Sequence, residues 1–333
     1  MDRRAFLSSA AACSIVSASA QIARAQPAPR FTQAARYSAE RDGATLLVVR
    51  HGVILAEMYF GATADHRWPI GTGSRAFAPL LLASLAEDRL LTLDEPVAAT
   101  LGDWGAHPVK STISIRSLMS GASGIAFDRR DTRDLATAIA LEPRDPPGVR
   151  FINNEAPYLL LAEIATRKLA AAGRDPDPAR YLTSRTLSPI GCTPIGWTRM
   201  PNGAPRLDDG IAVSARGWAQ AGELIRREGI WRAQELADGD TLREAMRGSF
   251  AESRAGMGLW LAAIARTRDD LDADSDLWRA ASPAPTDLAM AAGAGGQRLY
   301  IVPSIGLVVV RQSRSRDTQW SDAQFLTALW RDL

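Results

Sequence analysis

The sequence is poor in cysteine and histidine, and both shortages exclude kinds of function. It has two cysteines, Cys13 and Cys192, and three histidines. No group of histidine, cysteine and carboxylate residues has the spacing of metal ligands, so we expect neither a metal nor another cofactor. Because Cys13 lies in a predicted leader, Cys192 has no partner for an intrachain disulfide. An oxidising compartment is therefore allowed but not used.

Lysine is equally scarce. Lys110 and Lys168 are the only two lysines among 39 basic residues, and all the others are arginine. The formal net charge is +2, and no run of like charge is present, which gives no reason to expect nucleic acid or a membrane surface as a partner. Beyond the leader, no segment reaches the roughly 20 apolar residues of a membrane span. Nothing in the sequence indicates an oligomeric state.

Residues 1–25 have the pattern of an export signal. Arg3 and Arg4 precede a run of small and apolar residues, and Ala23-Arg24-Ala25 supplies a small-x-small cleavage site. The paired arginines resemble a twin-arginine signal, which predicts a periplasmic protein without a membrane span after cleavage. The alternative, a short amphipathic first helix, lacks a polar face.

The remaining chain, 26–333, is rich in predicted strands at both ends and in predicted helices between them. Apolar stretches at 44–50 and 53–60 flank His51-Gly52, which suits a two-residue hairpin turn. A second hairpin is expected from 298–302 and 306–311, before a final helix over 322–333. These patterns predict an α+β fold, with one antiparallel sheet from about 36–95 and 285–333, flanked by helices, and a mostly helical insertion over about 96–284.

The segment 68–96 carries a hydroxyl side chain at a predicted helix start. Apolar residues recur with helical spacing over 75–87, and Thr72 or Ser74 is placed to cap the first turn. The same position suits a nucleophile, because free N–H groups at a helix start stabilise developing negative charge. A plain cap is the more frequent use of such a residue.

Three further segments favour the nucleophile. They are 113–124, which ends Met-Ser-Gly-Ala-Ser-Gly, the pattern Pro-Gly-x-x-Phe-x-x-Asn at 147–154, and Ala-Gly-Ala-Gly-Gly-Gln-Arg-Leu-Tyr-Ile-Val-Pro at 292–303. In this order they resemble the penicillin-recognising serine hydrolases, in particular the branch of class C β-lactamases, esterases and 6-aminohexanoate-oligomer hydrolases. The resemblance implies a β-lactamase-like fold with its site between the sheet and the helical insertion.

The family's first motif places a serine three residues before a lysine, so that the amine helps to remove the hydroxyl proton. Aligned on Phe77, the motif falls on Thr72 and Arg75. Threonine can act as a nucleophile, but arginine stays protonated and cannot be the base. Shifting the register to Ser74 places Phe77 at the base position, and neither lysine lies in a matching segment.

The other two motifs also lack their proton-transfer groups. Counted from Pro147-Gly148 and from the pair Leu159-Leu160, the Tyr-x-Asn motif falls on Ile152 and Asn154. Asn154 could bind a carbonyl or amide, or could cap the helix that follows it. The third motif, Lys or His followed by a small residue and Gly, falls on Ala294, Gly295 and Gly296, where the glycines could admit a ligand to the strand or mark a bulge.

Two functions remain. The first is an exported family member that is impaired or inactive as a hydrolase and serves as a binding scaffold for a peptide, cell-wall or small amide or ester ligand. The second is a weak ester or amide hydrolase with Thr72 as nucleophile, Arg75 as electrostatic stabiliser, and His66 or water as base. The absence of the lysine, the tyrosine and the third-motif cation favours the scaffold.

Overall fold

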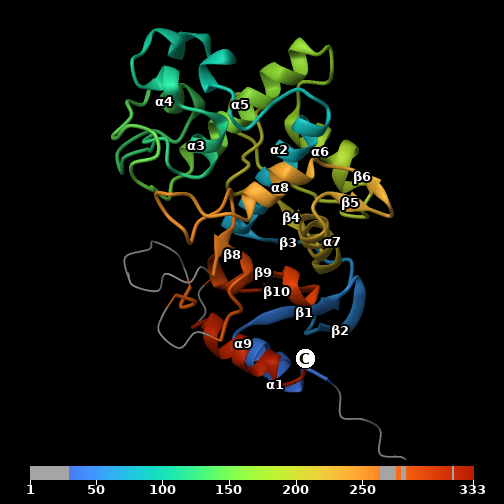
Figure 1. Ribbon diagram of the computed structural model, residues 1–333. Helices are drawn as coiled ribbons and strands as arrows, with labels where there is room; N and C mark the ends of the chain where they lie inside the picture. Colours follow the sequence, from blue (N-terminus) through green and yellow to red (C-terminus); the bar gives the residue numbers. More distant parts are fainter. Residues whose placement is uncertain (1–29, 263–274, 279–282, 317–318) are drawn as a thin grey trace, which may run out of the picture.

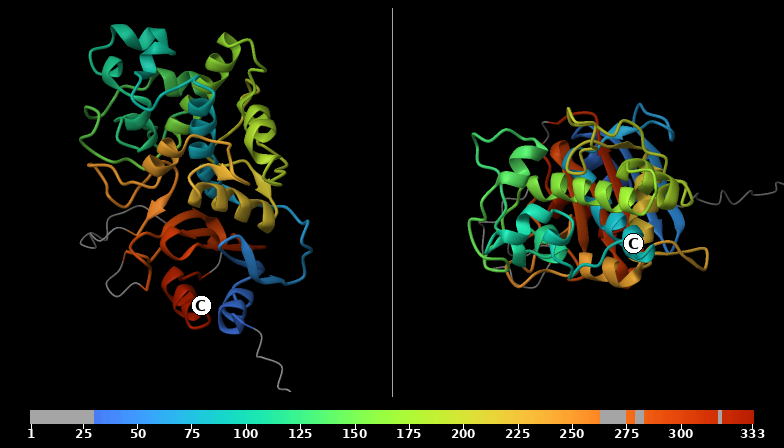
Figure 2. Two further views of the ribbon diagram at one scale, coloured as in Figure 1. Left: turned by 45° about the vertical axis from the view of Figure 1, so that its right-hand side comes forward. Right: turned by 90° about the horizontal axis from the view of Figure 1, so that it is seen from above.

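The computed structural model describes residues 30–262, 275–278, 283–316 and 319–333, so the predicted leader lies outside the described residues. A twisted sheet lies between two layers of helices (Figure 1). Two helices, α1 and α9, cover one face, and the larger helical region stands on the other. The two views of Figure 2 show the same stacking from the side and from above.

The elements follow the predicted order of strands, helices and strands. The main strands are β1 (Gly43–Arg50), β2 (Val53–Tyr59), β7 (Trp260–Leu261), β8 (Ala289–Gly293), β9 (Gln297–Val302) and β10 (Leu307–Ser313). Shorter strands are β3 (Trp68–Pro69), β4 (Ala212–Val213), β5 (Ile230–Trp231) and β6 (Gln234–Glu235). The α-helices are α1 (Thr32–Ala39), α2 (Ala78–Glu87), α3 (Ile115–Met119), α4 (Leu135–Ala140), α5 (Ala156–Ala171), α6 (Pro178–Leu182), α7 (Ala215–Arg226), α8 (Gly239–Ala245) and α9 (Asp322–Trp330).

The sheet joins the two ends of the chain. Its order is β2-β1-β10-β9-β8-β7, and all neighbouring pairs are antiparallel. Both predicted hairpins are present. In the first, His51 and Gly52 have φ angles of 50° and 79°, the left-handed pair that a two-residue turn requires. The predicted α+β class is confirmed. One strand, β7, comes from the stretch expected to belong to the helical insertion.

Both faces of the central strands β1, β10 and β9 are buried, and alternate residues of each strand serve opposite layers, whereas the edge strand β2 is partly exposed. In β1, Leu46 and Val48 pack with Phe325 of α9, whereas Leu47 and Val49 face the large helical region. Helix α7 lies directly on this second face against β9 and β10. Such two-sided burial explains the nearly continuous apolar runs that the sequence shows at these strands.

The predicted helix over 75–87 begins differently from our expectation. A 3-10 segment, η1 (Gly71–Phe77), comes first, and α2 follows it. The residue before α2 is Phe77, and no side chain caps the helix. The hydroxyl cap expected from Thr72 or Ser74 is therefore wrong, because both side chains bind backbone groups outside this helix. Within the described ranges, every helix is too short or too polar to cross a bilayer.

Candidate functional site

A cavity of about 250 Å³ opens between β8 of the sheet and the helical region. Its wall is built by segments distant in the sequence: the start of η1, the end of α3, residues 151–154, the start of α5, and the loop that leads into β7. Thr72, Arg75, Ile152 and Asn154 all contribute to this wall. The first two motifs therefore meet at one cavity.

Thr72 lies at the cavity with an exposed side chain. Its hydroxyl donates a hydrogen bond to the carbonyl oxygen of Ala292 in β8, with 3.0 Å between the oxygens. The proton of the candidate nucleophile thus points to a backbone carbonyl, which cannot accept it as a base. In the described part of the chain, no lysine, histidine or carboxylate lines the cavity.

The other candidates for nucleophile and base lie elsewhere. Ser74 is completely buried; its hydroxyl donates to the carbonyl of Gly71 and accepts from the N–H groups of Gly210 and Ile211. It fixes η1 to the segment before β4 and has no access to a ligand. His66 is exposed outside the cavity wall, with its ring 4.2 Å from that of Trp68. His66 is therefore not among the described residues that line the cavity with Thr72.

Arg75 points into the cavity and is held there by two contacts. Its Nη1 donates to Oδ1 of Asn153 at 2.6 Å, and its guanidinium carbon lies 4.9 Å from the ring centre of Tyr158. Its buried Nε has no hydrogen-bond partner among the described residues. An unsatisfied buried N–H costs about 1–3 kcal/mol, so this donor favours an arrangement of the cavity that brings an acceptor to it.

Asn153 is the residue that sequence reasoning missed. The second motif was counted from Pro147-Gly148 and from Leu159-Leu160; because the chain has three consecutive leucines, 159–161, the second of these counts is ambiguous by one residue. Counting from Leu160 and Leu161 moves the tyrosine position from Ile152 to Asn153. The contact between Asn153 and Arg75 supports this second register, because the family mechanism needs the second-motif side chain beside the first-motif cation.

Asn154 turns its amide away from Arg75. Its Oδ1 accepts from the N–H groups of Phe127 and Ala156, and its Nδ2 donates to the carbonyl of Phe127. The amide thus ties Ala156, the first residue of α5, to a neighbouring loop. The N-cap position of α5 is Glu155. Ile152 offers an apolar side chain to the cavity wall and bonds Gly121 through its N–H.

The residues of the third motif lie outside the cavity wall, and the wall residue of this strand, Ala292, comes two positions before Ala294. Ala294, Gly295 and Gly296 form a 3-10 turn after β8, and the cavity wall includes Ala292 in their place. The two glycines have φ angles of 74° and 72°, and a Cβ atom at either would collide with β10 or the segment after it. They allow close backbone packing, and they lie outside the wall of this cavity.

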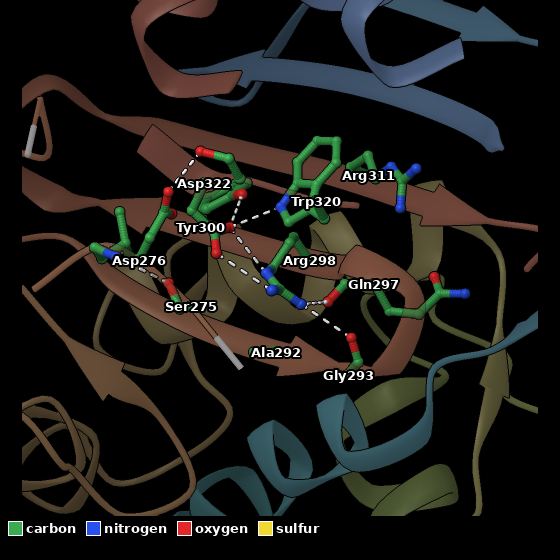
Figure 3. A network of polar contacts seen from close by, with 12 residues as sticks. Ser275, Asp276, Ala292, Gly293, Gln297, Arg298, Tyr300, Arg311, Trp320 and Asp322 are labelled. Carbon is green, nitrogen blue, oxygen red and sulfur yellow. Dashed lines mark hydrogen bonds and ion pairs between the residues drawn. The ribbon is translucent and has the colours of Figure 1, made fainter. Parts of the chain in front are cut away.

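A buried polar network supports this strand from the opposite side (Figure 3). Arg298 of β9 donates from Nε to Asp322 of α9 at 2.8 Å and from Nη1 to the carbonyl of Gly293 at 2.9 Å. Asp322 also accepts hydrogen bonds from Tyr300 and Trp320. Gly293 directly follows Ala292, so the network fixes the strand end that holds Thr72.

The electrostatics of the cavity are simple. Arg75 is the sole charged side chain in its wall as far as the chain is described, and the ion pairs of the described residues do not include it. Burial raises the pKa of the Tyr158 hydroxyl above its usual value, although Arg75 acts in the opposite direction. Tyr158 therefore stays neutral, and the described residues of the wall carry one positive charge, that of Arg75.

The order of the three motifs resembles that of the penicillin-recognising serine hydrolases, and comparison with known families supports this resemblance. A family model for β-lactamase matches residues 28–324. Comparison with curated protein sequences gave no significant match.

Solved structures share the fold over nearly the whole chain. A protein from Bacteroides dorei assigned as a β-lactamase is 16% identical, with a TM-score of 0.72 over 91% of this chain and 98% of that one. A penicillin-binding protein homologue from Caulobacter crescentus is 15% identical, with a TM-score of 0.68 over 91% and 98%. A family VIII carboxylesterase is 16% identical, with a TM-score of 0.68 over 92% and 98%. At these identities the likeness shows the fold alone.

Proposed function

Because the chain belongs to the β-lactamase family, we propose that it is an exported member that has lost serine-hydrolase catalysis and uses the family's site to bind a ligand. The ligand is a peptide fragment, a cell-wall fragment or a small amide or ester. The cavity suits the smaller of these, since about 250 Å³ lies just below the roughly 300–1,000 Å³ of most small-molecule sites.

The observation that carries this proposal is the pairing of Thr72 with Arg75. A hydroxyl attacks a carbonyl only when a nearby group takes its proton. The cation that shares the cavity wall with Thr72 is the guanidinium of Arg75, a group with five N–H donors and no acceptor for a proton. Asn153, which contacts that guanidinium, has an amide that neither accepts nor supplies a proton at neutral pH. Loss of a general base typically reduces the rate by about a hundred- to ten-thousandfold.

Covalent labelling tests the loss of catalysis directly. The purified protein and the variant Thr72→Ala are incubated with a fluorescent penicillin, beside an active penicillin-binding protein as a positive control. We expect no labelled band from either form of this chain. Hydrolysis of p-nitrophenyl acetate is measured in parallel, and we expect equal rates for the two forms.

Two results would contradict the proposal. One is a penicillin adduct that mass spectrometry locates on Thr72. The other is ester turnover that falls at least tenfold in Thr72→Ala. Either result would support the weak hydrolase that uses Thr72 as its nucleophile.

Export is the second part of the proposal. The pair Arg3-Arg4, the apolar run and the Ala23-Arg24-Ala25 site support a twin-arginine signal and a periplasmic location. Fractionation of bacteria that express the full chain should find the processed protein in the periplasm. The double variant Arg3→Lys and Arg4→Lys should leave an unprocessed protein in the cytoplasm, and unchanged export would contradict this assignment.

A further inference from the structure

Among the described residues, the wall of the cavity contains one charge and no carboxylate; Asp208, whose charge acts on Tyr158 of the wall, is paired with Arg206. Arg75 supplies that charge, and the described chain provides no acid in the wall and no ion pair to Arg75. The side chains that it does contact are uncharged: Asn153 accepts from Nη1, and Tyr158 presents the face of its ring. A half-buried positive charge that has no ion pair among the described residues attracts an anion from solution.

The guanidinium is also only partly hydrogen-bonded. Asn153 occupies Nη1, whereas Nε lacks an acceptor among the described residues. A guanidinium presents its donors in a planar fork that matches a carboxylate with two oxygens. A carboxylate is a better match than a phosphate dianion, because a single arginine supplies one positive charge.

The remainder of the wall is largely apolar and aromatic. Phe151 and Trp260 both line the cavity, with ring centres 6.1 Å apart in an edge-to-face arrangement, and Met119, Ile152 and Leu259 add aliphatic surface. A ligand that fills this space therefore carries an apolar or aromatic group beside its charged end.

We propose that the cavity binds a small organic carboxylate, with its carboxylate group on Arg75 and its apolar group against Phe151 and Trp260. This inference rests on the proposed function, since a ligand bound at Arg75 occupies the place where a hydrolase would hold its base. Arg75, at the lysine position of the first motif, then recognises the acid group of a ligand.

A pair of isosteric probes tests the role of charge. Phenylacetate and phenylacetamide have nearly the same shape and differ in charge, and their affinities are measured by isothermal titration calorimetry or ligand-observed NMR. We expect the wild-type protein to bind phenylacetate at least tenfold more tightly than phenylacetamide. Benzoate and acetate extend the series, and acetate should bind most weakly because it has no ring.

Two variants test whether Arg75 causes the preference for the acid over the amide. Arg75→Gln removes the charge, and the affinities for the acid and the amide should become equal within about twofold. Asn153→Asp keeps the arginine but places a carboxylate at the 2.6 Å contact, so an internal anion should displace the external one. Arg36→Gln is the matched control, because this side chain is 74% exposed on α1, which covers the face of the sheet opposite the large helical region (Figure 1), and the acid preference should remain.

Three outcomes would overturn the inference: no saturable binding of any carboxylate in the series, equal binding of acid and amide by the wild type, or a tenfold acid preference that survives in Arg75→Gln. Circular dichroism and melting temperature verify that each variant is folded. Failure here is distinguishable from failure of the proposed function. Penicillin labelling at Thr72 would refute the loss of catalysis, whereas an unlabelled protein without acid preference would refute only the carboxylate ligand.

Discussion

Arg298 and Asp322 form an ion pair with both side chains about 1% exposed. The guanidinium reaches Asp322 through Nε at 2.8 Å and through Nη2 at 3.2 Å, and it also binds the carbonyl of Gly293. The pair thus links the last helix to the strand that lines the cavity (Figure 3). Loss of this ion pair should therefore affect both the stability of the fold and the position of the strand that lines the cavity.

We expect Asp322→Asn to destabilise the protein by about 3–5 kcal/mol, because it leaves the charge of Arg298 buried without its partner. Urea unfolding followed by circular dichroism measures the change. The exposed residue Asp65 gives the matched control, and Asp65→Asn should change stability by less than about 0.5 kcal/mol. Similar stabilities for the two variants would show that the buried pair contributes little.

The same pair predicts a pH dependence. Burial opposes ionisation, but the charge of Arg298 and the hydrogen bonds from Arg298 and Tyr300 hold the pKa of Asp322 below its usual value. Its contribution to stability is therefore complete above the unfolded pKa of about 3.9 and is lost as the pH falls toward the lower folded value. The stability difference between wild type and Asp322→Asn should shrink as the pH falls from about 4 to 2. A difference that grows with acid would reverse the assigned sign.

Gly293 allows β8 to pass close to the start of η1. A Cβ atom there would collide with the carbonyl oxygen of Ile70. Gly293→Ala should therefore lower stability by about 1–3 kcal/mol. Gly102 has no atom within 4 Å of the corresponding position, so Gly102→Ala serves as control and should stay within about 0.5 kcal/mol. Equal melting temperatures for the two variants would contradict the predicted collision.

The choice between Ile152 and Asn153 can be tested by restoring the chemistry. The combination Thr72→Ser, Arg75→Lys and Asn153→Tyr places a hydroxyl, an amine and a phenol around the cavity. We expect p-nitrophenyl acetate hydrolysis about a hundredfold or more above wild type. The matched combination with Ile152→Tyr should show a much smaller gain. The reverse order of activities would support the register that places the motif on Ile152.

Much of the fold was predictable because its signals are local. The turn residues His51 and Gly52 and the apolar runs beside them define the first hairpin, and Pro303–Ile305 marks the second. The start of α2 was not predictable in this way. Ser74 has the chemistry of a cap, but its hydroxyl bonds Gly210 and Ile211, which approach it only in the folded chain. Such long-range partners are absent from local sequence patterns.

The candidate site was predicted in part for a similar reason. The i to i+3 spacing of Thr72 and Arg75 brings both to one wall, as the motif requires. The second motif was counted from a run of identical residues, Leu159–Leu161, and the third lies in the Ala- and Gly-rich stretch 291–296, so the sequence alone does not fix either position to the residue. Asn153 and Ala292 emerge only from contacts: Asn153 with Arg75, and Ala292 with Thr72.

The pairing of β1 with β10 also constrains the order in which the chain folds. These adjacent strands come from opposite ends of the sequence, and Gly43 is in register with Ser313. Until β10 has been synthesised, β1 can pair only with β2, and an isolated two-stranded hairpin is marginally stable. Closure of the sheet is therefore a late event that spans nearly the whole chain, and contacts of such large sequence separation slow folding. A chain that ends before β10 should behave as an unfolded or aggregating intermediate, even though the residues that line the cavity have all been made.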